Sequence, residues 1–158
     1  MTLRFDPSPS PLRGQARRRQ ARETAFARAM ALHDAGQLDA AEAIYRGLLA
    51  GRPRDPEVLS ALAFLRLCRG HPSEAAQLVE SALARHPNAP RLLGLRGLTL
   101  IRQWQFAEAE PFLARAFAGE PENHEIRGHY GRLLEHLRRH EEAVRVLAPV
   151  AFEHVENA

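Results

Sequence analysis

Small apolar residues recur along this chain at a fixed step of 34 residues. Each repeat carries an alanine, a second small residue twelve positions earlier and, in three of the four copies, a proline after the alanine. A fixed period of this length indicates one supersecondary unit that is stacked several times. The periodic positions are Ala41, Ala75, Ala109 and Ala143; Ala29, Ala63, Gly97 and Gly131; and Pro53, Pro87 and Pro121.

Within each repeat the pattern predicts two helices. Leu and Ala dominate the apolar residues, which favours helix over strand. Asp55 before Pro56 is typical of a helix start, as is Asn123. Pro72 opens a helix just after Gly70 closes the previous one. We expect first helices at about 22–35, 56–69, 90–103 and 124–137, and second helices at about 38–51, 72–85, 106–119 and 140–154.

The small residues mark where the two helices of a pair come close together. Antiparallel helices joined by a short turn approach closely only where side chains are small, so Ala29 can face Ala41 and Gly97 can face Ala109. Larger apolar residues then fill the layer around these positions. They are Leu32, Tyr45, Leu62, Val79, Leu100, Leu113, Leu134 and Leu147.

These positions resemble the consensus of the tetratricopeptide repeat family, in which Leu-Gly-x-x-Tyr is followed by Ala-x-x-x-Phe and then Pro. The resemblance implies an all-α fold, a right-handed superhelix (α-solenoid) of antiparallel helix pairs, with four degenerate repeats over 22–158. The four copies read Arg28-Ala29-x-x-Leu32 and Ala41-x-x-x-Tyr45; Leu62-Ala63 and Ala75-x-x-x-Val79; Arg96-Gly97-x-x-Leu100 and Ala109-x-x-x-Leu113; Tyr130-Gly131-x-x-Leu134 and Ala143-x-x-x-Leu147.

The resemblance also implies that the first helix of each pair lines a concave groove that binds a partner. The family's groove positions carry an apolar stripe in this chain, and solvent-facing apolar stripes often mark binding sites. The residues expected there are Phe26, Met30, Phe64, Leu67, Leu98 and Ile101, with Arg102 and Arg132 beside them. The alternative is that these apolar residues belong to the core. Family members that grip a C-terminal carboxylate use Lys and Asn at such positions, and this chain has neither there.

Charge separates a basic N-terminal segment from the rest of the chain. The net charge is +3, but residues 1–23 contribute six arginines against two acids, and the remainder is close to neutral. Because residues 1–21 also contain three closely spaced prolines, we expect a flexible basic arm there. The run lacks interleaved aromatic residues, which argues against nucleic acid as the partner. The chain has no run of apolar residues long enough to cross a membrane, and its lone cysteine, Cys68, favours a reducing, cytoplasmic location.

Nothing in the sequence predicts catalysis, a cofactor or a metal. His129, His136 and His140 share one region, but no motif with metal-ligand spacing accompanies them, and no nucleophile or phosphate-binding loop is recognisable. We therefore expect a non-enzymatic binding module for a protein or peptide partner, acting as an adaptor, scaffold or small chaperone. The alternatives are a targeting or regulatory subunit of an enzyme system, such as a bacterial glycosyl- or sulfotransferase, or a protein similar to the type III secretion chaperones.

The last predicted helix contains Pro149, which should kink or end it. If no further helix covers that end, apolar side chains are left on an open edge that a second copy of the chain could cover. We expect Val146, Val150 and Phe152 on this possible homodimer edge.

Overall fold

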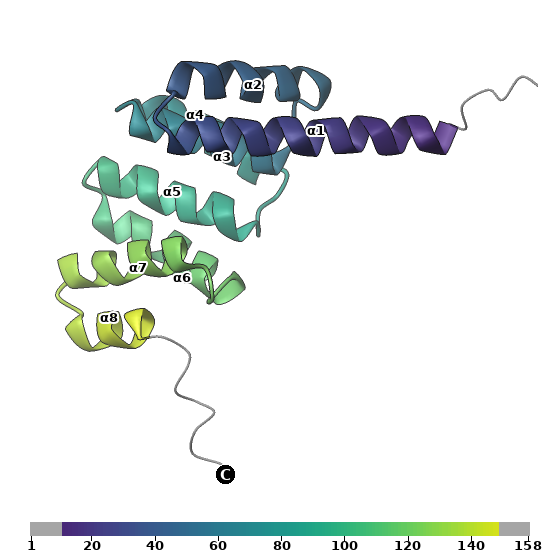
Figure 1. Ribbon diagram of the computed structural model, residues 1–158. Helices are drawn as coiled ribbons and strands as arrows, with labels where there is room; N and C mark the ends of the chain where they lie inside the picture. The colour runs from purple at the N-terminus through teal and green to yellow at the C-terminus, as the bar shows by residue number, and fades with distance from the viewer. Residues whose placement is uncertain (1–10, 149–158) are drawn as a thin grey trace, which may run out of the picture. The chain divides into compact units, whose positions relative to one another are not determined.

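The computed structural model describes residues 11–148, and within them all regular structure is helical. The turns that join the helices are short (Figure 1). An all-α chain of helix pairs is the predicted fold class, which is confirmed. The helices are α1 (Pro11–Asp34), α2 (Leu38–Gly51), α3 (Pro56–Cys68), α4 (Pro72–Leu83), α5 (Pro90–Arg102), α6 (Phe106–Gly119), α7 (His124–His136) and α8 (His140–Leu147).

The chain divides into two compact units, Met1–Pro53 and Arg54–Ala158. The first unit is the pair α1 and α2, which pack against each other. Tyr45 of α2 is fully buried, and its ring lies 6.0 Å from that of Phe26 on α1. Its hydroxyl donates a hydrogen bond to the sulfur of Met30 at 3.2 Å. Ala29 and Ala41, the two periodic small residues of this repeat, are both fully buried.

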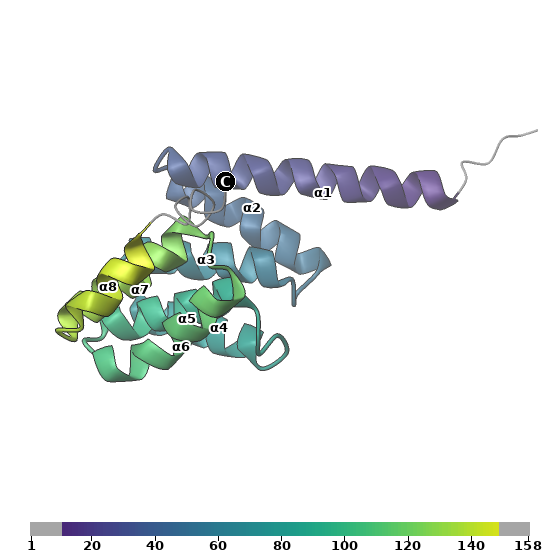
Figure 2. The same cartoon turned by 90° about the horizontal axis from the view of Figure 1, so that it is seen from below.

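Helix α1 begins at Pro11, so the predicted start near residue 22 is wrong. Proline suits the first helical position, and the Gln, Ala and Arg residues that follow are good helix formers. Residues 12–20 are all exposed, and the N-terminal half of α1 runs past the end of α2 (Figures 1 and 2). Residues 1–10 lie outside the described part of the chain, and the dispensability of the basic segment for folding stays a prediction.

The second unit stacks three helix pairs. Each first helix packs on its own second helix, and α4 and α6 pack on the first helices that follow them. The first helices also touch directly, with α5 lying against both α3 and α7. The helices begin where the sequence predicts, but α8 ends at Leu147 rather than near residue 154. The residues from 149 onward lie outside the described range.

The predicted helix starts at Asp55 and Asn123 are confirmed by their hydrogen bonds. The Asp55 carboxylate accepts from the backbone N–H groups of Glu57 and Val58, at 3.1 and 3.2 Å. The Asn123 side-chain oxygen accepts from Glu125 and Ile126 in the same way, at 3.1 and 3.3 Å. Each cap satisfies backbone donors that would otherwise lack a partner at the helix end.

Gly97 and Gly131 lie under leucine side chains of the facing helix, which explains why these two positions carry no side chain. A Cβ atom added to Gly97 would come within 2.5 Å of Leu113, and one added to Gly131 would come equally close to Leu147. The side chain over each glycine is thus the large residue one helical turn beyond the periodic alanine. Around these contacts one core cluster joins Leu100, Ala109, Leu113, Tyr130, Leu133, Leu134 and Ala143.

Candidate partner-binding face

The predicted groove residues of the first unit lie on α1 and differ in exposure. Phe26 is half-buried against Tyr45, and Met30 is partly exposed while accepting the Tyr45 hydrogen bond. Both side chains are therefore held by contacts to α2. They cover part of the Tyr45 ring, so in this unit they have a packing role.

In the second unit, Phe64 is the predicted apolar residue that is exposed. Its side chain is 38% exposed on α3. Leu67 and Leu98 are only 2% and 7% exposed and belong to a core cluster with Ala63, Ala75 and Val79, so the prediction of an exposed position is wrong for these two leucines. Both leucines are buried because their side chains lie where α3, α4 and α5 pack together, in one cluster with residues of all three helices.

Ile101 and Arg102 are neighbours at the end of α5 with different environments. Ile101 is half-buried and packs on the cluster of Leu100 and Leu113. Arg102 is exposed, and it makes no hydrogen bond or ion pair within residues 11–148. An arginine without an anionic partner on a protein surface is available to bind a carboxylate from another molecule.

Arg132 on α7 is exposed and fixed by two hydrogen bonds. Its Nε donates to the Gly128 carbonyl at 3.2 Å, and its Nη2 lies 2.8 Å from Nδ1 of His129. Burial lowers the pKa of the His129 imidazole, and the charges of Arg132 and Arg102 lower it further. His129 is thus neutral at pH 7, and its Nδ1 accepts the hydrogen bond from Arg132.

These residues form one surface made by the first helices of the second unit. Burial raises the pKa of the Cys68 thiol on α3, and the charge of Arg102 opposes this rise. The same charge lowers the pKa of His129 on α7. Cys68 is exposed one helical turn after Phe64. We call this surface the A-helix face: Phe64, Cys68, Arg102, His129 and Arg132. The resemblance to the family places Cys68 at a groove position, whereas sequence reasoning missed His129, although its i, i+3 spacing to Arg132 could have found it.

The predicted homodimer edge falls mostly outside the described residues. Val146 is half-buried against the core cluster, whereas Val150 and Phe152 lie beyond residue 148. On α8, the exposed apolar side chains are instead Val144 and Leu147. Self-association through this end of the chain stays a prediction.

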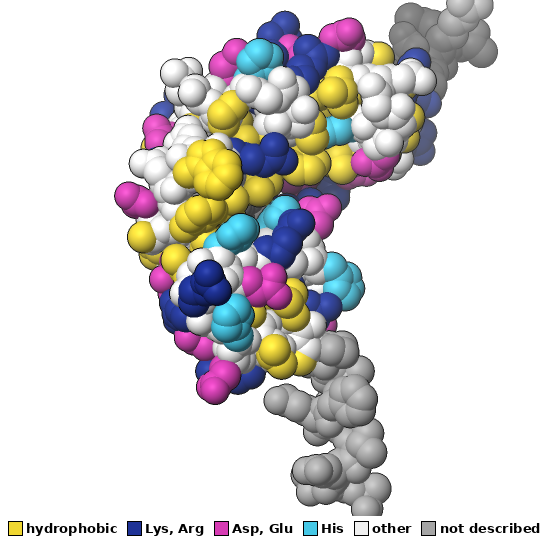
Figure 3. Space-filling model, turned by 90° about the vertical axis from the view of Figure 1, so that its left-hand side faces the viewer, with side chains coloured by type: hydrophobic (Ala, Val, Ile, Leu, Met, Phe, Trp, Pro, Cys, Tyr) yellow, Lys and Arg dark blue, Asp and Glu magenta, His cyan; other side chains and the backbone are white. Residues whose placement is uncertain are grey.

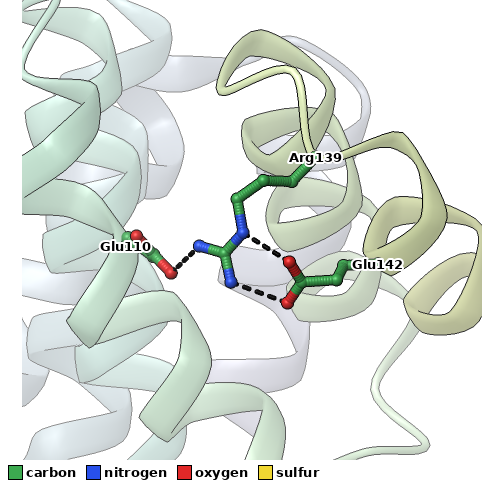
Figure 4. A network of polar contacts seen from close by, with 3 residues as sticks. All are labelled: Glu110, Arg139 and Glu142. Atoms are coloured by element: carbon green, nitrogen blue, oxygen red, sulfur yellow. Dashed lines mark hydrogen bonds and ion pairs between the residues drawn. The ribbon is translucent and has the colours of Figure 1, made fainter.

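A polar network ties α6 to the start of α8. Arg139 donates to both carboxylate oxygens of Glu142 at 2.6 Å, and its Nη1 donates to Glu110 (Figure 4). The hydrogen bonds to Arg139 lower the pKa of the Glu142 carboxyl. The three charges satisfy one another, so they form a structural clamp between neighbouring repeats.

Among the described residues, no group of three or more His, Cys, Asp or Glu side chains could hold a metal ion. The described helices also include none that combines the length and the apolar character that a membrane crossing requires. The A-helix face presents one phenyl ring, one thiol, one imidazole and two guanidinium groups.

The model of the tetratricopeptide repeat family matches residues 32–98 and 100–158. The chain belongs to this family. Tetratricopeptide repeats build extended surfaces that bind other proteins. The predicted family membership is thus confirmed over most of the chain, from the end of α1 onward. The comparison with curated proteins found no match.

Solved structures of low sequence identity share the fold. PilF of Pseudomonas aeruginosa is 22% identical with a TM-score of 0.69, over 82% of this chain and 62% of that one. MamA 41-end from Desulfovibrio magneticus RS-1 is 20% identical with a TM-score of 0.62, over 79% of this chain and 71% of that one. A chain in the structure of Naa15/Naa10 bound to HypK-THB is 20% identical with a TM-score of 0.70, over 80% of this chain and 19% of that one.

Proposed function

We propose that this protein is a non-enzymatic interaction module whose A-helix face binds an apolar or amphipathic segment, peptide or helix, of a protein partner. The observation that carries the proposal is the exposed Phe64 ring on the same face as Arg102 and Arg132. An aromatic ring supplies apolar contact area, and arginines select a segment with an acceptor or acidic group. Such a face suits an adaptor, a scaffold or a small chaperone, all of which bind without chemistry.

The electrostatics of the face support a segment that is not basic. Arg102 is unpaired within residues 11–148, and Arg132 bonds only to a neutral histidine and a backbone carbonyl. Neither guanidinium charge is neutralised by an acid of the described chain. A lysine- or arginine-rich segment would meet two like charges there, whereas a segment with a carboxylate would gain charge-assisted hydrogen bonds.

We also propose a reducing compartment, the cytoplasm, as the place where the module works. Cys68 is the only cysteine of the chain and is exposed on the proposed binding face. A free thiol at a binding surface persists in a reducing environment and is oxidised outside it.

Cys68 provides a native probe for testing the face. Partners captured from native lysate by the full chain would be identified by mass spectrometry and purified. Each would then be tested for its ability to slow maleimide labelling of Cys68. Phe64→Ser and Arg132→Glu should both weaken capture by about tenfold or more, with the helical circular dichroism unchanged.

The control is Val144→Ser on α8, which removes an exposed apolar side chain away from the first helices. It should capture the same partners as the unchanged chain. If Phe64→Ser also captures them undiminished, or if bound partner leaves the labelling rate of Cys68 as it was, the proposed face is wrong.

A further inference from the structure

The turn inside each helix pair contains one residue in the left-handed backbone region, always at the same repeat position. These residues are Gly36 (φ +74°), Gly70 (φ +78°), Trp104 (φ +63°) and Arg138 (φ +63°). Glycine adopts this conformation freely, whereas a residue with a Cβ atom is strained in it. The last two turns therefore carry strain that the first two avoid. Glycine would avoid this strain in the last two turns, as it does in the first two. The presence of Trp104 and Arg138 there indicates that their side chains have a use.

The Trp104 side chain is 80% exposed, yet its orientation is set by neighbouring rings. It meets Phe106 edge to face, with the ring centres 5.9 Å apart. Phe106 in turn stacks on His136 of α7, 5.0 Å away and nearly parallel at 10°. An indole held in place by this row loses little freedom on binding, which favours affinity. Its N–H donates to nothing within residues 11–148.

Arg138 is the other strained residue, and its guanidinium is also free. It is exposed and makes no hydrogen bond or ion pair within residues 11–148. Glu110 and Glu142 bind its neighbour Arg139 instead (Figure 4). The face that carries the α5–α6 and α7–α8 turns shows hydrophobic side chains beside arginine and histidine (Figure 3).

We propose that these two turns form a second docking surface, the turn edge, made of Trp104, Phe106, His136 and Arg138. Its occupant is a segment of a partner protein in which an acidic residue adjoins an apolar one. The carboxylate accepts hydrogen bonds from the Arg138 guanidinium, and the apolar side chain packs on the Trp104 ring. The turn edge shares no residue with the A-helix face.

A single carboxylate fits the turn edge better than a nucleic acid does. Single-stranded nucleic acid binds through a series of free aromatic faces along a basic groove. Here Phe106 and His136 cover each other, so Trp104 offers the one free ring of the row. The exposed acids Glu108 and Glu141 stand on the first turns of α6 and α8, so they disfavour any partner that brings several anionic groups and leave room for a single carboxylate at Arg138.

Trp104 is the only tryptophan of the chain, so its fluorescence reports on this surface alone. The probe is a short fluorescein-labelled peptide in which one glutamate adjoins a phenylalanine, and the control peptide has lysine in place of the glutamate. Binding is followed by anisotropy and, with unlabelled peptide, by Trp104 emission. We expect the acidic peptide to bind with a Kd below about 1 mM and to shift the Trp104 emission to the blue. Its Kd should be about tenfold lower than that of the lysine peptide.

The informative variant is Trp104→Gly with Arg138→Gly, because it restores the glycine that closes the other two turns. It should keep or raise the melting temperature while weakening the acidic peptide by about tenfold or more. The matched control, Arg91→Ala, removes an exposed arginine at the opposite end of α5 and should bind as the unchanged chain does.

Several results would overturn the proposal. One is that the double glycine variant binds the acidic peptide as tightly as the unchanged chain does. Another is a fall in the melting temperature of this variant, which would make Trp104 and Arg138 structural residues. Tighter binding of a uridine oligonucleotide than of the acidic peptide would assign the edge to nucleic acid. An emission shift that grows with protein concentration alone would assign it to a second copy. Phe64→Ser should leave peptide binding unchanged, so failure here is separable from failure of the A-helix face.

Discussion

Phe64 and Leu98 occupy the same repeat position on α3 and α5, yet one is 38% exposed and the other 7%. The two helices share their length of 13 residues and their place as first helix of a pair. Leu98 is buried because α5 packs against α3 and α4, where Leu98 joins the cluster of Leu67 and Val79. Equivalent positions in a repeat therefore share a backbone geometry without sharing an environment.

The most direct test of this difference in exposure is to replace each of the two residues with serine. Leu98→Ser removes a buried leucine and leaves an unpaired hydroxyl in the core, so it should cost about 2–5 kcal/mol of the free energy of unfolding. Phe64→Ser should cost less than Leu98→Ser, because 38% of Phe64 is already exposed to water. Urea denaturation followed by circular dichroism measures both values. Equal losses at the two sites would show that Phe64 is a core residue and not a surface one.

Gly97 and Gly131 are a second pair of equivalent positions, and they test whether the leucine that faces each glycine can move to make room for a side chain. Gly97→Ala and Gly131→Ala each place a Cβ atom 2.5 Å from a leucine of the facing helix. Leu113 over Gly97 is fully buried and has no room to move, so that change should cost about 1–3 kcal/mol. Leu147 over Gly131 is partly exposed and can rotate away, which predicts a smaller loss. The same denaturation series ranks the two, and a reversed order would mean that α8 resists displacement more than α6 does.

The repeat explains why the fold was predictable and why exposure was not. The step of 34 residues, the caps at Asp55 and Asn123 and the glycines of the turns are local signals, and the helices of the second unit begin where these signals place them. Exposure of Leu67 and Leu98 depends on contacts between repeats, which a single-repeat pattern does not contain. The start of α1 was missed for another reason. Residues 12–20 bury nothing, so their helix leaves no apolar periodicity in the sequence.

Trp104 was missed although the sequence contained the signal. It stands 34 residues after Gly70, in the position that glycine fills in the first two turns. Aligning the four turns by their period would have shown an aromatic residue where the backbone requires a positive φ. Departures from a repeat at its conformationally demanding positions are thus a better guide to function than the positions that conform.

Arg138 and Arg139 offer a comparison of adjacent arginines, one free and one paired, that pH can resolve. Because the pKa of Glu142 is lowered in the folded state, its ion pair contributes stability above the unfolded value of about 4.3, and this contribution is lost as the pH falls through the lower, folded value. Arg139→Ala should therefore be less stable than the unchanged chain at neutral pH, and the gap should close in acid. Arg138→Ala should show a gap that does not change over that window. Thermal unfolding of the three proteins between neutral pH and about pH 3 gives the comparison. If Arg139→Ala stays less stable than the unchanged chain in acid, the loss of stability comes from packing and not from the ion pair.

The smallest effect is expected from shortening α1, the one first helix that is much longer than its equivalents. It spans 24 residues, whereas α3, α5 and α7 span 13 each. Its extra turns carry an arginine run, and the ion pair of Arg19 with Glu23, at 2.8 Å, is exposed. Exposed ion pairs of this kind contribute little to stability. Like charges four residues apart, such as Arg13 and Arg17, destabilise a helix. Deleting residues 1–20 should therefore shift Tm by less than about 4 °C, roughly the shift that 1 kcal/mol produces in a chain of this size. Calorimetry of the deleted and full chains checks this. A larger fall in Tm would mean that the basic segment packs on the folded chain, and that α1 owes its length to a contact and not to helix propensity alone.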